Sequence, residues 1–155
     1  MARSDATDSL VEQILIKAAP ELVFAALTEP SQLVAWWGDP AQYWCTDWTL
    51  DLRVGGRWRS EGTSINGRAF FVEGEFLEID PPKTLSFTWI ASWTMAPALT
   101  VHIVLEPRGD RTWLTWTMRG FDGYPQALAD HRGGLPGIVV WLRRYLEEGR
   151  TVVTN

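Results

Sequence analysis

The residue types that carry most nucleophilic and metal chemistry are few and scattered in this sequence. It contains two histidines, His102 and His131, and one cysteine, Cys45, and these do not stand at metal-ligand spacing. Cys45 follows Trp44 and has no recognisable nucleophile signature around it. We expect Cys45 to pack as a small hydrophobic side chain, and the sequence predicts neither a metal ion nor a cofactor.

Carboxylates are more frequent, but their pattern does not favour acid–base catalysis. Glu73, Glu75 and Glu78 cluster along one predicted strand region, which indicates a solvated face. General acid–base work requires burial and a raised pKa, and the sequence shows neither. Asp51 and Arg53 share one strand phase and predict a surface ion pair, which contributes little to stability.

Tryptophan is the residue type whose number stands out, with ten in 155 residues. Each indole buries roughly 150–250 Å² and carries one N–H that needs an acceptor. Two interpretations are open: a packed core with several half-exposed rings, or a cavity lined with rings that holds a ligand. We favour the cavity.

Composition limits the classes of protein to which the chain can belong. Hydrophobic residues make up 46% and charged residues 21%, which is typical of a globular domain. Lys and Arg number 14 against 19 Asp and Glu, and no basic run exceeds Arg143–Arg144, so a nucleic-acid partner is not expected. The first ten residues lack the apolar core of a secretory signal, and no apolar run approaches the length of a membrane span.

These features predict a cytoplasmic protein, and a single cysteine fits that reducing compartment. We expect residues 1–9 to form a flexible N-terminus, residues 10–149 to form one domain, and residues 150–155 to form a tail.

The elements that must position the indoles follow from hydrophobic periodicity. Residues 11–17 predict a strand, and two short helices follow because Pro20 favours a helix start and Pro30 interrupts the apolar spacing. Alternation through residues 48–119, with Asn66-Gly67 as a hairpin turn, predicts about six antiparallel strands.

Single residues modify this pattern of strands and helices. Leu52 continues the inward phase of Trp48, and Gly74 is interpreted as the site of a bulge. Near the C-terminus, apolar residues from Ile138 to Leu146 recur at helical spacing. A longer helix from Pro125 would have to be kinked near Pro136.

A sheet with one apolar face needs a cover, and only the C-terminal helix is long enough to provide it. The predicted fold is therefore α+β, with a curved antiparallel sheet gripping a long C-terminal helix and two short helices after the first strand. Strand phase places His102 on the outer face, whereas His131 lies near the glycine-rich entry to the last helix. The residues expected to bind a ligand between sheet and helix, or at the mouth of the gap, are Trp36, Trp37, Trp48, Trp58, Phe76, Trp89, Trp116, Met118, Trp141 and Tyr145.

Five segments in order carry a resemblance to a known family. They are Trp36-Trp37-Gly38 and the segments 51–58 (DLRVGGRW), 74–82 (GEFLEIDPP), 85–89 (LSFTW) and 112–115 (TWLT). Over residues 10–148 the chain resembles the branch of the START-like (SRPBCC) superfamily named after activator of heat shock protein 90 ATPase homologues. The resemblance implies a helix-grip fold with a deep hydrophobic cavity, which in relatives holds lipids, sterols or polyketides. One departure is Leu135, because family members usually carry Trp at this position, after the matching Gly134.

Three functions remain open at this stage. The first is a protein that binds an unidentified hydrophobic or amphipathic small molecule, with no nucleic acid and no membrane insertion. The second is a cyclase- or aromatase-type enzyme using the same cavity, for which Tyr145 is the best inward-facing titratable group. The third is a co-chaperone-like interaction module with outward-facing tryptophans. The sequence is also compatible with a homodimer.

Overall fold

The computed structural model describes residues 9–94 and 96–154. Residues 1–8 of the expected flexible N-terminus lie outside the described residues. All strands join one antiparallel sheet of eight strands in the order β1-β8-β7-β6-β5-β4-β3-β2. The strands are β1 (Leu10–Ile16), β2 (Gly38–Asp39), β3 (Tyr43–Leu50), β4 (Arg57–Ser64), β5 (Ala69–Asp80), β6 (Thr84–Ala91), β7 (Leu99–Arg108) and β8 (Arg111–Arg119).

Two short helices follow β1, as the two prolines predict. Helix α2 (Pro20–Thr28) and helix α3 (Pro30–Trp36) each begin with proline in the first turn, where the missing N–H costs nothing. They bury Val23, Leu27 and Leu33, and α3 packs against β3.

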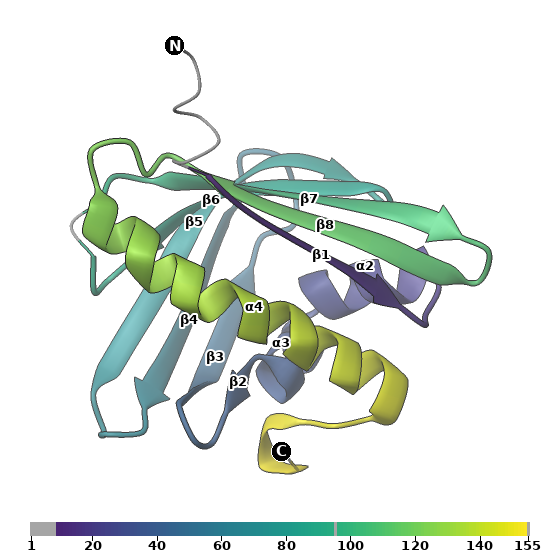
Figure 1. Ribbon diagram of the computed structural model, residues 1–155, viewed down its shortest axis with the longest axis horizontal. Coiled ribbons are helices and arrows are strands. Elements are labelled where there is room, and N and C mark those ends of the chain that lie inside the picture. The colour runs from purple at the N-terminus through teal and green to yellow at the C-terminus, as the bar shows by residue number, and fades with distance from the viewer. Residues whose placement is uncertain (1–8, 95, 155) are drawn as a thin grey trace.

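The long helix α4 (Pro125–Glu148) crosses in front of the curved sheet (Figure 1). It runs without interruption through Pro136, and Gly149 in the left-handed conformation, at φ 70°, ends it. Pro136 lacks the N–H that would bond the carbonyl of Arg132. Both residues are exposed, so solvent can hydrate that carbonyl and the helix can extend back to Pro125. A short 3-10 helix (Val152–Thr154) follows in the C-terminal tail.

An irregular pairing in β3 decides which of its side chains face inward. The register with β4 shifts between Cys45 and Asp47, which is the signature of a bulge. Strict alternation would send Cys45 and Trp48 to opposite faces, but the extra residue lets both face the interior. The prediction that Leu52 continues this inward phase is wrong, because β3 ends at Leu50 and Leu52 is exposed.

Gly74 is not the site of the bulge that we expected. The register shift in β5 lies between Phe76 and Glu78. Gly74 instead allows a close approach, because a Cβ there would collide with the Thr88 carbonyl oxygen and the Trp58 indole nitrogen. Glycine at this position is a packing requirement for the Trp58 ring.

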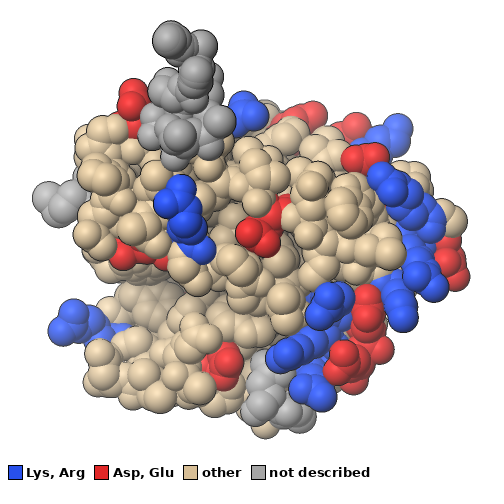
Figure 2. All heavy atoms as spheres, viewed as in Figure 1, with Lys and Arg blue, Asp and Glu red and all other residues tan. Residues whose placement is uncertain are grey.

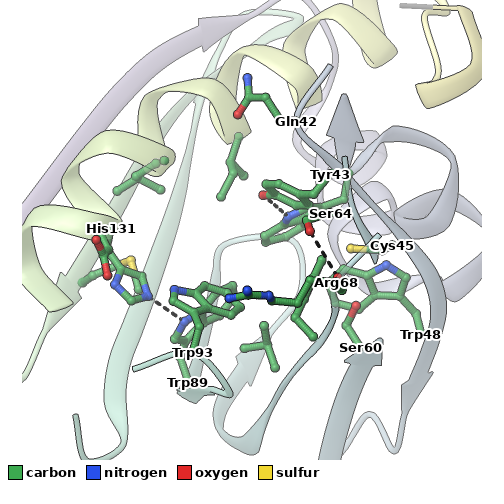
Figure 3. A pocket seen from close by; sticks show the side chains of 18 of the residues that line it. Gln42, Tyr43, Cys45, Trp48, Ser60, Ser64, Arg68, Trp89, Trp93 and His131 are labelled. Carbon is green, nitrogen blue, oxygen red and sulfur yellow. Dashed lines mark hydrogen bonds between the residues drawn. The ribbon is translucent and has the colours of Figure 1, made fainter. Parts of the chain in front are cut away.

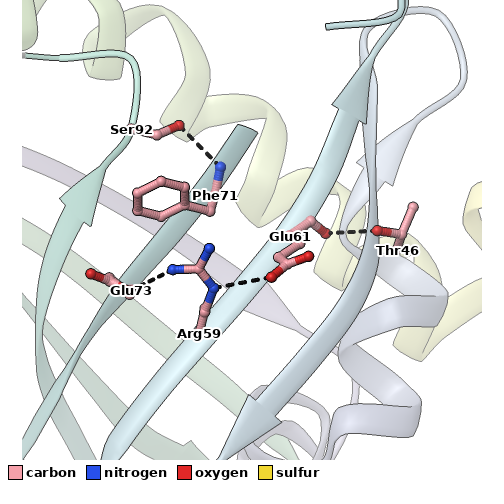
Figure 4. Close-up of polar contacts among 6 residues, drawn as sticks. All are labelled: Thr46, Arg59, Glu61, Phe71, Glu73 and Ser92. Carbon is pink, nitrogen blue, oxygen red and sulfur yellow. Dashed lines mark hydrogen bonds and ion pairs between the residues drawn. The ribbon is translucent and has the colours of Figure 1, made fainter. Parts of the chain in front are cut away.

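On strands β4 and β5, three side chains form a polar cluster (Figure 4). The Arg59 guanidinium donates to the carboxylates of Glu61, at 3.1 Å, and Glu73, at 2.6 Å. It also lies 4.2 Å above the centre of the Phe71 ring. Asp51 and Arg53 form the surface pair that we expected, at 2.8 Å.

The predicted α+β helix-grip fold is confirmed: a curved antiparallel sheet wraps one face of a long C-terminal helix (Figure 1). His102 lies at the sheet's outer face, beside Ser86 and Glu78, as its phase predicts. In the described part of the chain, no helix is both long and apolar enough to cross a membrane.

Candidate functional site

A cavity of about 330 Å³ lies between the sheet and the N-terminal half of α4. Its walls come from β3, β4, β5, β6, β8 and α4. Its volume falls at the lower end of the range for small-molecule sites, about 300–1,000 Å³. Figure 2 shows the surface hollowed on this side, between α4 and the ends of β4 and β5.

Four tryptophans from four separate segments form one apolar wall of the cavity. Trp37 lies at the centre, with its ring centroid 5.1 Å from Trp48, 6.0 Å from Trp89 and 5.8 Å from Trp116. Trp37 directly follows α3, so the two short helices position this ring beneath the sheet. The rings of Trp48, Trp89 and Trp116 come from strands β3, β6 and β8.

His131 forms part of the helix side of the cavity (Figure 3). Its Nε2 accepts the Trp89 indole N–H at 3.1 Å, and its Nδ1 lies 2.8 Å from the Ala127 carbonyl oxygen. An indole N–H can only donate and a carbonyl can only accept, so the ring is neutral with its proton on Nδ1. Burial lowers the pKa of His131, against smaller opposing effects of the Ala127 carbonyl and Asp130.

Two further titratable groups in the lining are held in their neutral forms. Burial raises the pKa of the Cys45 thiol to about 11, so it is protonated at neutral pH and unsuited to nucleophilic attack. Ser60 and Trp48 lie near the thiol and have a smaller, opposite effect on its pKa. Neither of them forms a hydrogen bond of normal geometry with the thiol. Burial also raises the pKa of Tyr43, whose hydroxyl accepts the Trp37 N–H at 3.3 Å.

The exposed part of the lining forms the mouth. Arg68 at the β4–β5 hairpin and Asp130 on α4 are the charged residues there, and no ion pair joins them among the described residues. Asp130 accepts a hydrogen bond from Gln126 at 3.0 Å. Trp93, which is 50% exposed, stacks on His131 with ring centroids 6.2 Å apart.

The structure brings together half of the residues expected to bind a ligand. Trp37, Trp48, Trp89, Trp116 and Met118 line the cavity. Trp58 and Phe76 line a neighbouring space of about 20 Å³, which is packed core. Their role as ligand contacts stays a prediction.

The other three expected residues, Trp36, Trp141 and Tyr145, line neither space. The Trp36 indole donates to the Ala26 carbonyl at 2.9 Å and packs the short helices. Trp141 is buried with its ring edge-on to Tyr43. The Tyr145 hydroxyl donates to Gln32 at 3.0 Å, so Tyr145 is not placed to act in the cavity.

Several lining residues were missed by the sequence reasoning, for two reasons. His131, Leu135 and Ile138 share one helical face, and this signal was hidden because the helix was expected to be disturbed before Ile138. Cys45 lines the wall because of the bulge in β3, whereas Ser60 shares the inward phase of Trp58 on β4, a position that a search for apolar residues does not mark. Nothing in the local sequence distinguishes this bulge from an ordinary strand.

The tryptophan rings do not form the outward-facing patch that an interaction module would use. Trp93 is the single exposed one of the ten, whereas Trp36, Trp37, Trp58, Trp89, Trp116 and Trp141 are each at most 6% exposed. In the described ranges, no group of three or more His, Cys, Asp or Glu residues is arranged to hold a metal ion.

Comparisons with known proteins agree with this architecture. Protein CV1439 from Chromobacterium violaceum superposes with a TM-score of 0.78 at 23% identity, covering 91% of this chain and 98% of that protein. Protein NE0264 from Nitrosomonas europaea gives 0.77 at 26% identity, over 94% and 97%. DynU16, a protein of the dynemicin biosynthetic locus, gives 0.75 at 22% identity, over 94% of this chain and 49% of that one.

No curated protein matches the chain. The family model of Activator of Hsp90 ATPase homolog 1-like proteins matches residues 17–147, which is most of the sequence. The chain therefore belongs to the family of Activator of Hsp90 ATPase homolog 1-like proteins.

Proposed function

We propose that this protein binds an apolar or amphipathic small molecule in the cavity between the sheet and α4. The observation that carries the proposal is the space itself: about 330 Å³ remains open among indole rings, whereas protein interiors are normally packed to crystal density. An unfilled apolar space loses dispersion contacts that a guest restores. Apolar burial, at about 25 cal/mol per Å², would supply the affinity.

The charge distribution of the lining supports an apolar body with its polar end at the mouth. The deep wall consists of neutral groups, because Cys45, Tyr43 and His131 are held in their uncharged forms. Among the described residues of the lining, the charged side chains are Arg68 and Asp130, both at the exposed mouth. An ionised group would therefore be costly at the bottom of the cavity and tolerated at its entrance.

DynU16 belongs to the dynemicin biosynthetic locus, which is compatible with a binding role for this fold. At 22% identity it supports the fold alone. The proposal therefore rests on this chain's own cavity.

The direct test is a fluorescence titration with phenylnaphthylamine, a neutral dye whose emission rises in apolar surroundings. We expect saturable binding to the wild type. The variant Val72→Phe places a ring into the cavity from β5 and should weaken binding at least about tenfold. The matched control is Val11→Phe, because Val11 is 53% exposed on β1 and is not part of the lining.

Circular dichroism would check that both variants keep the fold. Absence of saturable dye binding to the wild type would contradict the proposal, as would equal binding by the Val72→Phe variant. Native mass spectrometry of freshly purified protein would in addition reveal a co-purifying guest.

A further inference from the structure

The cavity wall holds three buried polar groups whose hydrogen-bonding capacity is unused. The Ser60 hydroxyl and the indole N–H groups of Trp48 and Trp116 have no hydrogen-bond partner in the described part of the chain. Within residues 9–94 and 96–154, no other buried side-chain nitrogen or oxygen lacks a partner. They come from three strands, β4, β3 and β8, and all three residues line the same cavity.

Neighbouring indoles show that this condition is not general. Trp37 and Trp89, which also line the cavity, donate to the Tyr43 hydroxyl and to His131 Nε2. Outside the cavity, Trp58 donates to the Thr88 carbonyl at 3.2 Å. The chain thus supplies acceptors for four buried indoles, those of Trp36, Trp37, Trp58 and Trp89, and leaves the indoles of Trp48 and Trp116 unpaired.

The unused groups define the chemistry of a matching guest. An indole N–H can only donate, so Trp48 and Trp116 require an acceptor. Two acceptors of the wall are already engaged, since His131 Nε2 receives Trp89 and the Tyr43 oxygen receives Trp37, whereas the Ser60 hydroxyl can either donate or accept. A carbonyl oxygen could accept from either indole or from the hydroxyl, whereas a donor on the guest could pair with the Ser60 oxygen but not with the indoles.

The wall also indicates that the inserted end of the guest is uncharged. Arg68 is the cationic side chain among the described lining residues, and it belongs to the exposed mouth rather than to the wall around Ser60 and Trp48. A carboxylate at this depth would lose its hydration without gaining a counter-ion. A neutral carbonyl pays a much smaller desolvation cost and recovers it through the waiting donors.

Figure 3 shows how Ser60 and Trp48 lie beside Cys45 at one end of the cavity. The Ser60 hydroxyl oxygen and the Trp48 indole nitrogen are covered by surrounding protein atoms. The Ser60 hydroxyl turns on a single side-chain torsion, so rotation can bring it towards a guest. The protonated Cys45 thiol is a weak hydrogen-bonding partner and competes poorly with a carbonyl oxygen.

We propose that the guest is an uncharged, largely apolar molecule whose inserted end carries a carbonyl oxygen, as in a ketone, quinone or lactone, facing Ser60 and the Trp48 or Trp116 N–H. This inference rests on the proposed function and adds the chemical class of the ligand. The two unpaired indole N–H groups require an acceptor, the Ser60 hydroxyl can donate to the same atom, and the apolar wall disfavours charge.

The test compares three probes that share one ring skeleton: fluorene, fluorenone and fluorene carboxylate. Fluorenone differs from fluorene by a carbonyl in place of a methylene group. We expect the wild type to bind fluorenone roughly three- to tenfold more tightly than fluorene, the range that one net hydrogen bond supplies. Fluorene carboxylate should bind more weakly than fluorenone. Equilibrium dialysis measures all three dissociation constants.

The Ser60→Ala variant isolates the hydroxyl. The ratio of its dissociation constants for fluorene and fluorenone should fall towards one, which means that most of the preference for fluorenone is lost. A second readout needs no variant: in a nitrogen–proton correlation spectrum, fluorenone should move the indole signal of Trp48 or Trp116 downfield, and fluorene should not. Trp48→Phe and Trp116→Phe assign those two signals.

The outcomes separate the two proposals. If fluorene and fluorenone bind equally, or if Ser60→Ala keeps the full preference and neither indole signal moves, the carbonyl inference is overturned and cavity binding stands. If fluorene carboxylate binds most tightly, the inserted end is charged and the inference is again overturned. If none of the probes binds up to its solubility limit, both proposals are overturned.

Discussion

At the scale of single residues, His131 shows how a buried polar group is fixed by its partners. Its two ring nitrogens face a donor and an acceptor, Trp89 and the Ala127 carbonyl, and this arrangement accepts only the neutral tautomer. Protonation of Nε2 would set two donors against each other. The ring is packed by Phe121 and Trp93 as well, so it cannot turn away without opening the cavity wall.

This geometry gives a prediction for stability against pH. The pKa of His131 lies below its ordinary value of 6.5, chiefly because of burial. As the pH falls below about 6.5, the histidine is protonated in the unfolded chain but stays neutral in the folded protein. The free energy of unfolding therefore decreases until the folded ring is protonated as well. Urea unfolding at pH 7.5 and pH 5.5 measures the decrease.

The variant His131→Gln retains an acceptor for Trp89 and cannot titrate. It should lose less stability than the wild type between these two pH values. His102→Gln, at an exposed ring of the outer face, is the matched control. An equal loss in wild type and His131→Gln would show that another group sets the pH dependence.

At the scale of elements, glycines in α4 and β5 have opposite roles. Gly133 lies inside α4, and a Cβ there would meet no atom within 4 Å. Gly74 lies in β5, where a Cβ would collide with the Thr88 carbonyl of the paired strand. The first glycine weakens its helix through backbone entropy, and the second permits two strands and the Trp58 ring to approach.

Substituting each glycine by alanine should therefore shift stability in opposite directions. Gly133→Ala should raise the free energy of unfolding by about 0.5–1 kcal/mol. Gly74→Ala should lower it by about 3 kcal/mol or more, because overpacking a strand pair displaces the backbone. Chemical denaturation of both variants provides the measurement. A stabilised Gly74→Ala variant would contradict the packing role assigned to that glycine.

At the scale of the whole molecule, the sheet and α4 act as two layers held apart by indole rings. The guest would contact both layers, so binding should couple directly to global unfolding. With a guest at one hundred times its dissociation constant, mass action adds about 2.7 kcal/mol to the folded state. For a chain of this size that corresponds to a rise in melting temperature of roughly 5–10 °C.

Differential scanning calorimetry with phenylnaphthylamine checks this coupling. The variant Leu135→Trp enlarges a lining side chain of α4, and it should abolish most of the rise while leaving the unliganded protein folded. A ligand-induced rise that is undiminished in this variant would place the binding site elsewhere.

The fold could be predicted from the sequence because its signals are local. Each signal acts over a few residues: alternating strands between Trp48 and Arg119, prolines at two helix starts, and an apolar stripe from Ile138 to Leu146. The sheet has one apolar face, and the C-terminal helix is the element long enough to cover it. Four of the expected lining residues, Trp48, Trp89, Trp116 and Met118, follow from strand phase, and Trp37 follows from its place at the end of the short helices.

The polar character of the cavity was decided by tertiary structure. A bulge between Cys45 and Asp47 turns Cys45 and Trp48 to the same side, and a helix that continues through Pro136 places His131 against Trp89. Whether a buried N–H finds an acceptor depends on atoms far apart in the chain, such as Trp89 and His131, which lie 42 positions apart. Periodicity specifies which face a residue occupies, but only the packed chain determines which donors are left without a partner.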